Sequence, residues 1–296
     1  MGSQAETEDE FTVLVTGFAP FKSAYPVNPA WEIASRLPAY LPAAAPSSSE
    51  PTSSPTLPCV RILVHPEAVR VNYQTVRKLV PQLWQTRDSS DPEEHLQTTD
   101  GAGDRGNATD ADYDAEAGGR GRHLPEKPKR IDACIHIGMA DPRLYYSIEH
   151  RGHRDGYTMP DVDGERLLDE ERRRRLGDEW IWSGVPDELE TAFDVGDILD
   201  RWRKHSPPDS DLRISEDAGR YLCDFIYFSS LAYLYKRNEQ RRVLFLHVPS
   251  AATDAAVAKG KELTIQLIRS LAESEIKRQR NVAIRKGDKI AVELRV

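Results

Sequence analysis

The feature that most limits the possible folds of this chain is a set of short stretches that are apolar almost throughout. FTVLVTG (11–17) and IDACIHIG (131–138) both end in glycine, and CVRILV (59–64) and RVLFLHVP (242–249) have similar lengths. Segments with helical signals lie between them. Strands that are apolar on both faces are typical of a parallel sheet covered on both sides. The sequence therefore predicts an α/β fold: a single domain with a mostly parallel, twisted sheet and helices on both faces.

The helices are predicted from their own signals. Asn28 followed by Pro29 is an N-cap and first-turn pair that opens a helix. Further helices are expected over residues 71–85 and 194–205, and from about 254 to 279.

Two stretches interrupt this alternation. Residues 42–58 are rich in Pro, Ser, Ala and Thr, and residues 87–129 are polar, with many Gly and Asp residues. Neither stretch can bury enough apolar surface to offset the entropy lost on ordering. We therefore expect both to be disordered insertions within one domain that spans residues 1–296.

Composition excludes several kinds of partner. The formal net charge of −8 argues against nucleic acid, because phosphate contacts need clustered Lys and Arg. The one basic cluster, Arg172–Arg175, is framed by acidic residues, so we expect a solvated, salt-bridged helix face. No apolar run reaches the length of a membrane span, and the acidic first residues do not resemble a secretory signal. No membrane partner is expected, and the oligomeric state stays open.

The cysteines and histidines give no sign of a metal or cofactor. Cys59, Cys134 and Cys223 are far apart and form no CxxC pair, which argues against a zinc ribbon or a redox pair. An odd number of free thiols fits a reducing compartment, so we expect a cytoplasmic protein. His150 and His153 have a spacing that one metal could use. No acidic or cysteine partner follows at ligand spacing, so a solvated loop is expected there.

Ligands of such sheets bind outside the carboxyl ends of the strands, so chemistry is expected after Gly17, after Gly138 and around His247. Cys223 follows a weak strand and turn, LRISEDAG, and stands near the start of a helix, where N–H groups and the helix dipole favour a thiolate. From the residues alone, Cys223 is either a core thiol or a nucleophile, and His247 is either structural or catalytic. Glu149 is either a surface charge or an acid that orients a base.

Four blocks of different composition follow one another between residues 11 and 250. They are VLVTGFAPFKSAYPVNPAWEIASRLP (13–38), IDACIHIGMADPRLYYSIEHRGHRDGYTMPDVDG (131–164), ISEDAGRYLCDFIYFSSLAYL (214–234) and VLFLHVPS (243–250). In this order they resemble the pyroglutamyl-peptidase I family, the C15-type cysteine peptidases. The first block is similar to the TGF-x-PF and NP-[ST]-WE patterns of that family. The others are similar to its blocks that hold the catalytic Glu, the nucleophile and the general base.

The resemblance implies roles for particular residues. Cys223 takes the position of the nucleophile, His247 that of the general base, and Glu149 that of the residue that orients the base. Four residues take positions in the pocket for the lactam ring: Phe18, Phe21, Asn28 and Leu222. The implied activity is that of a cysteine omega-peptidase without a cofactor, which removes N-terminal pyroglutamate from peptides through an acyl-enzyme.

The chain departs from the family pattern inside the same blocks. Met139 stands where the family has Gln, Asp141 and Pro142 replace two glycines, and Thr158 replaces an Arg. Asp224 replaces an Asn and places a carboxylate next to the thiol, which opposes thiolate formation. We expect the thiolate-favouring groups to outweigh it. The departures keep a second function open: a divergent homologue that binds a small ligand or a partner, or hydrolyses a different acyl group.

Overall fold

The computed structural model describes residues 10–21, 25–43, 58–86, 128 and 130–293. Contacts divide the chain into one unit of Met1–Trp84 with Ile131–Val296 and a second of Gln85–Arg130, and all the described helices and strands lie in the first unit. The insertions expected at 42–58 and 87–129 lie almost wholly outside the described residues. Their disorder therefore stays a prediction, as does the assignment of the whole chain to one domain.

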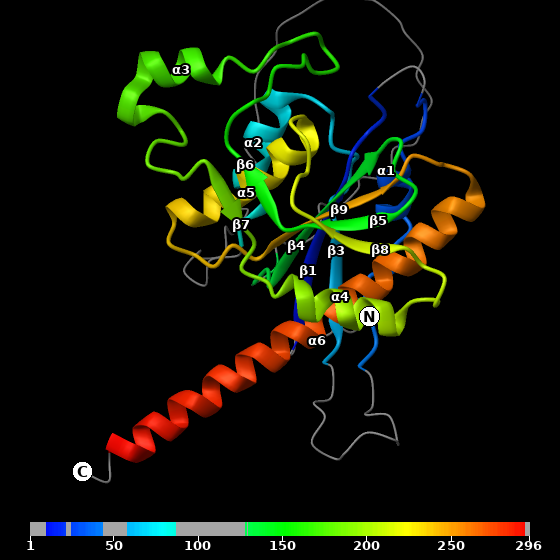
Figure 1. The fold of residues 1–296 in the computed structure, drawn as a ribbon, viewed down its shortest axis with the longest axis vertical. Coiled ribbons are helices and arrows are strands. Elements are labelled where there is room, and N and C mark those ends of the chain that lie inside the picture. The colour runs from blue at the N-terminus through cyan, green and yellow to red at the C-terminus, as the bar shows by residue number, and fades with distance from the viewer. Residues whose placement is uncertain (1–9, 22–24, 44–57, 87–127, 129, 294–296) are drawn as a thin grey trace, which may run out of the picture. The chain divides into compact units, whose positions relative to one another are not determined.

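A seven-stranded sheet forms the centre of the first unit (Figure 1). Across the sheet, the strands are β2 (Tyr40–Leu41), β3 (Val60–Val64), β1 (Phe11–Gly17), β4 (Ala133–Ala140), β9 (Val243–Pro249), β5 (Tyr146–Glu149) and β8 (Leu212–Ser215). Strands β3, β1, β4 and β9 run parallel to one another, and β8 runs parallel to β5. Strand β5 is antiparallel to β9, and β2 is antiparallel to β3. The sheet is thus mostly parallel, as predicted.

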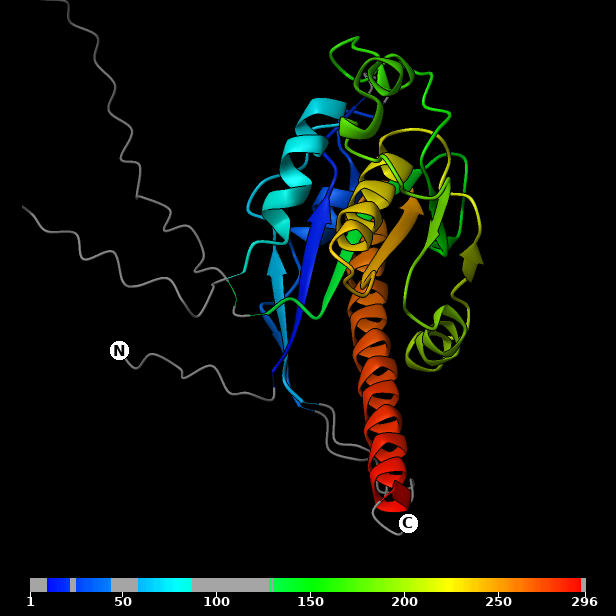
Figure 2. The same cartoon turned by 90° about the vertical axis from the view of Figure 1, so that its left-hand side faces the viewer.

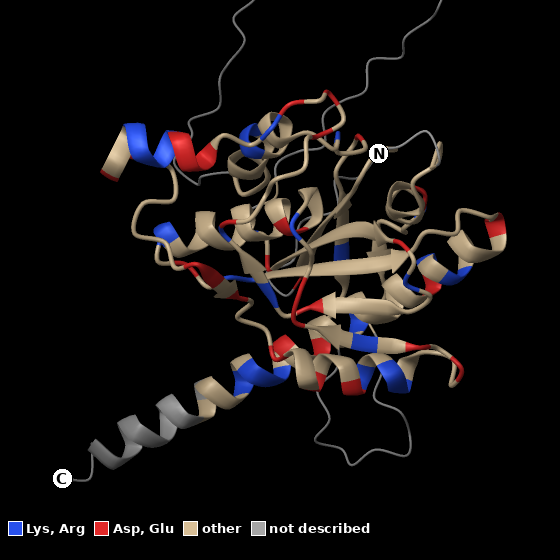
Figure 3. Ribbon diagram, turned by 45° about the horizontal axis from the view of Figure 1, so that its top comes forward, with Lys and Arg blue, Asp and Glu red and all other residues tan. Residues whose placement is uncertain are grey.

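Helices cover both faces of this sheet (Figure 2). On one face lie α1 (Pro29–Ala34), α4 (Val195–His205) and α6 (Asp254–Glu293), and on the other lie α2 (Tyr73–Leu83) and α5 (Leu222–Lys236). Each set of helices shares an apolar core with the sheet face beneath it. Strands β1, β4 and β9 are buried almost from end to end and carry no charged side chain (Figure 3). The fold predicted from apolar strands and helical signals is confirmed.

The helix boundaries follow their capping residues. The Asn28 side chain accepts a hydrogen bond from the N–H of Ala30 at 3.0 Å, so the expected N-cap is present at the start of α1. Asn72 and Asp194 cap α2 and α4 in the same way. Helix α6 continues to Glu293, beyond the expected end. Within the described residues, no helix has the length and apolarity that a membrane span requires.

The arginine cluster lies on α3 (Asp169–Leu176), which is followed by a 3-10 turn, η1 (Gly177–Glu179). Arg172 pairs with Asp169 at 3.5 Å, and Arg174 pairs with Glu170 at 3.9 Å. Figure 3 separates the acidic first turn of α3 from the basic turns that follow. The predicted salt-bridged, solvated face is confirmed.

A two-stranded sheet, β6 (Arg151–His153) with β7 (Glu188–Glu190), packs against α5. His153 is therefore only 7% exposed. Its backbone N–H lies 3.2 Å, and its Nδ1 3.3 Å, from Oδ1 of Asp224. The expected solvated loop is wrong for His153, because a strand holds it against a helix.

Candidate active site

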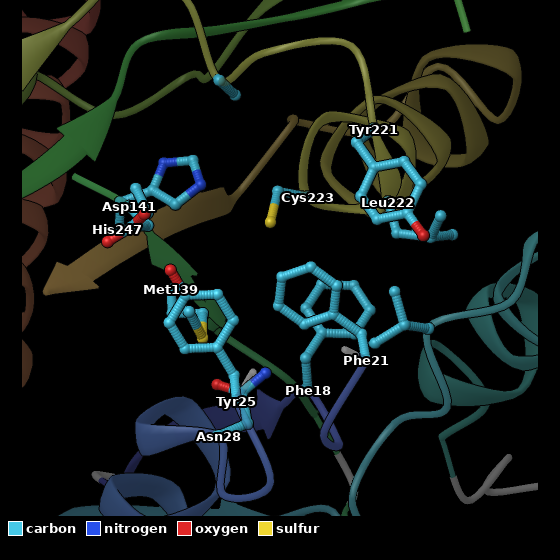
Figure 4. Close-up of a pocket in the computed structure, with 13 residues that line it drawn as sticks. Phe18, Phe21, Tyr25, Asn28, Met139, Asp141, Tyr221, Leu222, Cys223 and His247 are labelled. Carbon is cyan, nitrogen blue, oxygen red and sulfur yellow. The ribbon is translucent and has the colours of Figure 1, made fainter. Parts of the chain in front are cut away.

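A pocket of about 240 Å³ opens where the carboxyl ends of β1 and β4 meet the start of α5 (Figure 4). It is lined by Phe18, Phe21, Tyr25, Asn28, Val71, Met139, Ala140, Asp141, Ala218, Tyr221, Leu222, Cys223 and His247. Six of the seven residues singled out from the sequence thus share one cavity. The seventh, Glu149, lies behind His247 in β5. No group of three or more His, Cys, Asp or Glu side chains in the described part of the chain could hold a metal ion.

Cys223 lies in the first turn of α5, one residue after the start of the helix. Its sulfur points into the pocket (Figure 4). Gly138 of β4 lies directly against it: a Cβ atom at Gly138 would be 2.8 Å from Sγ of Cys223 and 2.6 Å from Cζ of Phe245. Only a residue without a side chain leaves the sulfur in this position.

The ionisation of Cys223 differs from the sequence-based expectation. Removal from water is the largest cause that raises the pKa of the thiol, and together with the charges of Glu149 and Asp224 it raises this pKa to about 12. Arg143 and the backbone N–H of Cys223 act in the opposite direction and are outweighed. The expectation that the groups favouring the thiolate outweigh those opposing it is therefore wrong. The cost of desolvating an anion exceeds the benefit of the helix start, so the sulfur carries a proton at neutral pH.

His247 lies in β9, where its backbone pairs with Ser147 of the antiparallel strand β5. Glu149 is two residues further along β5 and points to the same face of the sheet. Its Oε1 lies 2.7 Å from Nδ1 of His247, and the two side chains are 0% and 4% exposed. A carboxylate only accepts hydrogen bonds, so Nδ1 carries the ring proton and Nε2 is the basic nitrogen.

Two further side chains hold Glu149, and neither was identified from the sequence. Nη1 of Arg143 donates to Oε1 of Glu149 at 2.9 Å and to the hydroxyl of Ser147 at 3.1 Å. The Ser147 hydroxyl donates to the same Oε1 at 3.2 Å. Nη2 of Arg143 reaches the backbone oxygen of Asp217 at 3.2 Å. Arg143, Ser147 and His247 thus all contact Oε1 of Glu149, whose side chain is fully buried.

Aromatic rings form one wall of the pocket. Phe18 is buried and Phe21 is half-buried. The ring centroid of Phe21 lies 6.2 Å from those of both Tyr25 and Tyr221. The two tyrosines were missed from the sequence, because nothing in their local pattern separates them from ordinary loop or core residues. Leu222 is fully buried and closes the pocket behind the rings.

Asn28 has two tasks in this wall. Its Oδ1 caps α1, and its Nδ2 donates to the backbone oxygen of Ala19 at 2.9 Å. The side chain therefore ties the loop after β1 to the start of α1, while it also lines the pocket.

Two of the departures from the family pattern line the pocket, and the other three lie outside its lining. Met139 and Asp141 line the pocket, whereas Pro142 is exposed and Thr158 lines a separate surface hollow beside α3. The carboxylate of Asp224 turns away from the pocket and accepts a hydrogen bond from the Tyr157 hydroxyl at 3.0 Å. The chain has therefore changed the rim of the pocket, through Asp141, as well as its lining.

The fold is α/β, and its pocket holds a cysteine and a histidine, with a glutamate behind the histidine. The family model described as pyroglutamyl peptidase matches residues 126–284, more than half of the chain, and the chain belongs to this family. Pyroglutamyl-peptidase 1 of Homo sapiens is 24% identical over 237 residues, which cover 80% of this chain and 78% of that protein. Pyrrolidone-carboxylate peptidase of Pyrococcus furiosus is 27% identical over 119 residues, which cover 40% of this chain and 51% of that protein.

Solved structures of similar proteins have the same fold. Pyroglutamyl peptidase I from Bacillus amyloliquefaciens superposes with a TM-score of 0.54 at 18% identity, over 89% of this chain and 95% of that chain. A mutant pyrrolidone carboxyl peptidase from Pyrococcus furiosus superposes with a TM-score of 0.53 at 18% identity, over 89% of this chain and 99% of that chain.

Proposed function

We propose that this chain is a cysteine peptidase that removes pyroglutamate from the N-terminus of peptides, with Cys223 as nucleophile, His247 as general base and Glu149 as the residue that orients His247. The observation that carries the proposal is the 2.7 Å contact between Oε1 of Glu149 and Nδ1 of His247, behind a pocket that His247 shares with Cys223. A nucleophile, a base and an orienting acid are the three parts that acyl transfer by a side chain needs.

The neutral thiol sets the order of proton movements. In the first step, the Cys223 proton passes to Nε2 of His247 as the sulfur attacks the carbonyl carbon that follows the lactam ring. The imidazolium is stabilised by Glu149 and then gives its proton to the leaving amine, which breaks the amide bond. Water attacks the resulting thioester with His247 again as base, which releases pyroglutamate and restores the thiol.

The oxyanion of each tetrahedral intermediate needs hydrogen-bond donors near the sulfur. The first N–H groups of a helix have no partner within the helix, and Cys223 lies among them in α5. We assign these backbone N–H groups to the oxyanion, because they are fixed in direction before the substrate binds.

Recognition of the substrate follows from its lack of charge. A lactam ring offers two flat faces and one amide edge, so aromatic side chains and a few polar groups suffice to bind it. Phe18 and Phe21 are the proposed ring contacts, with Asn28 and Leu222 completing the pocket. Met139 offers no strong hydrogen bond, so more of the binding energy comes from the aromatic faces.

A fluorogenic pyroglutamyl amide tests the proposal. We expect the parent chain to hydrolyse it and Cys223→Ala to lose at least about a thousandfold in kcat/KM, because no nucleophile remains. Cys59→Ser is the matched control, since Cys59 lies outside the pocket, and it should keep the parent rate. If the parent shows no turnover but pyroglutamate raises its melting temperature, the chain is a binding protein instead.

We also propose that the enzyme works in the cytoplasm. The support is chemical: Cys59, Cys134 and Cys223 are all free thiols, and one of them is the proposed nucleophile. Free thiols persist in a reducing compartment. Fractionation of cells with an antibody against the chain would test this location.

A further inference from the structure

Asp141 is the only carboxylate among the thirteen residues that line the pocket. We propose that Asp141, together with Tyr25 and Ser250, forms a subsite for the cationic side chain of the residue that follows pyroglutamate. The preferred substrates are then peptides that begin with pyroglutamate followed by Lys or Arg. This inference rests on the proposed function and adds to it the chemical class of the second substrate residue.

The position of Asp141 matches the path of the leaving peptide. Asp141 follows directly on β4, and its Oδ1 accepts a hydrogen bond from Ser250, three residues after His247, at 3.0 Å. In Figure 4, Asp141 lies with His247 on one side of the Cys223 sulfur, and the two phenylalanine rings lie on the other. His247 protonates the leaving amine, so the peptide that carries this amine extends on the Asp141 side.

The groups that contact the Asp141 carboxylate are neutral. Asp141 is exposed at the rim of the pocket, and its contacts among the described residues are to the neutral hydroxyls of Ser250 and Tyr25. The hydrogen bond to Asp141 raises the pKa of Tyr25, as expected when a carboxylate holds the hydroxyl proton. Neutral donors orient the carboxylate without cancelling its charge, so a cation of the substrate gains an oriented partner.

Tyr25 adds a second element that favours a cation. Its ring stacks on Phe21 with an angle of 19° between the ring planes. An aromatic wall therefore runs from the proposed lactam contact to the carboxylate. The methylene groups of a Lys or Arg side chain can lie along this wall, and the ring face attracts the charged end. The family pattern has glycine at the position of Asp141, so this charge is a property of the present chain.

The test compares pyroglutamyl-Lys, pyroglutamyl-Gln and pyroglutamyl-Glu amides as substrates for the parent chain, Asp141→Asn and Asp209→Asn. Asp209 is an exposed acid outside the pocket and controls for the change in net charge. We expect the parent kcat/KM for the Lys substrate to exceed that for the Gln substrate by about two- to fivefold, the range for an exposed ion pair, and the Glu substrate to be the poorest. The Lys-to-Gln ratio should approach one in Asp141→Asn and stay at the parent value in Asp209→Asn.

Salt provides a readout that needs no variant. The parent ratio should fall toward one in about 1 M NaCl, where charges are screened beyond roughly 3 Å. A ratio of one in the parent at low salt, or an unchanged ratio in Asp141→Asn, would overturn the subsite and leave the proposed function intact. Failure to hydrolyse any pyroglutamyl amide would overturn both.

Discussion

Gly138 offers the sharpest test of how the nucleophile is positioned. A Cβ atom at this position would lie 2.8 Å from Sγ of Cys223 and 2.6 Å from Cζ of Phe245, whereas ordinary contacts begin at about 3.4 Å. In Gly138→Ala, the sulfur must therefore retreat by about 0.6 Å and the ring carbon by about 0.8 Å. Neither can move freely, because Cys223 is fixed by α5 and Phe245 is fully buried.

Two magnitudes follow from this displacement. Overpacking a core by one methyl group costs about 1–3 kcal/mol of stability, which corresponds to a fall of roughly 2–12 °C in Tm for a chain of this size. A shift of about 1 Å in a reacting atom costs about a hundredfold in rate, so a retreat of about 0.6 Å should lower kcat by roughly tenfold or more. The loss should appear in kcat rather than KM, because the aromatic wall stays in place.

The assay combines steady-state kinetics on a pyroglutamyl amide with thermal unfolding. Gly196→Ala is the matched control, since a Cβ atom there meets nothing closer than Oδ1 of Asp194 at 3.4 Å. Gly196 lies in the first turns of α4, so alanine should preserve or slightly raise stability. The reasoning about the sulfur would be refuted by a Gly138→Ala protein with the parent kcat, whatever its Tm.

Three further outcomes are expected. Asp224→Asn should lower the pKa of Cys223 by removing a buried negative charge; its iodoacetamide reaction should then begin at lower pH than in the parent, and an identical pH profile would contradict this. Arg143→Met should leave the buried Glu149 carboxylate without its cation, which costs about 3 kcal/mol or more; urea unfolding that matches the parent would count against it. Burial lowers the pKa of His136 from 6.5 to about 3, so between these two pH values only the unfolded chain binds this proton. The neutral, buried His136 therefore does not lower the free energy of unfolding above pH 6.5. As the pH falls from 6.5 toward 3, it lowers the free energy of unfolding by about 1.4 kcal/mol per pH unit. His136→Asn should show a flatter pH dependence of unfolding, and parallel curves would disprove the assignment.

Much of the fold could be predicted from the sequence because the signals are local. The strand at residues 11–17 and the Asn28 cap were both identified from a few neighbouring letters, and the structure has them where expected. The direction of β5 could not be predicted, because a four-residue strand carries no information about its partner. That direction matters for the site: the antiparallel pairing with β9 brings Glu149 beside His247.

The site was predicted less completely than the fold, for physical reasons. Arg143 holds Glu149 across a turn, and only the folded chain shows that a guanidinium six residues away returns to the same carboxylate. The predicted direction of the pKa shift of Cys223 was wrong because desolvation depends on how much protein surrounds the sulfur. The sequence pattern of a helix start carries no information about this burial. His153 was misplaced for a similar reason, since two neighbouring elements bury it.

The proton on Cys223 has a consequence for the lifetime of the enzyme. Peroxides and disulfides react with thiolates far faster than with thiols, so a sulfur that ionises only as a substrate arrives is a poor target for oxidation. The burial that keeps the thiol protonated would then also slow its oxidation between turnovers. Such a peptidase would lose activity to peroxide more slowly than an enzyme whose nucleophilic cysteine is permanently ionised.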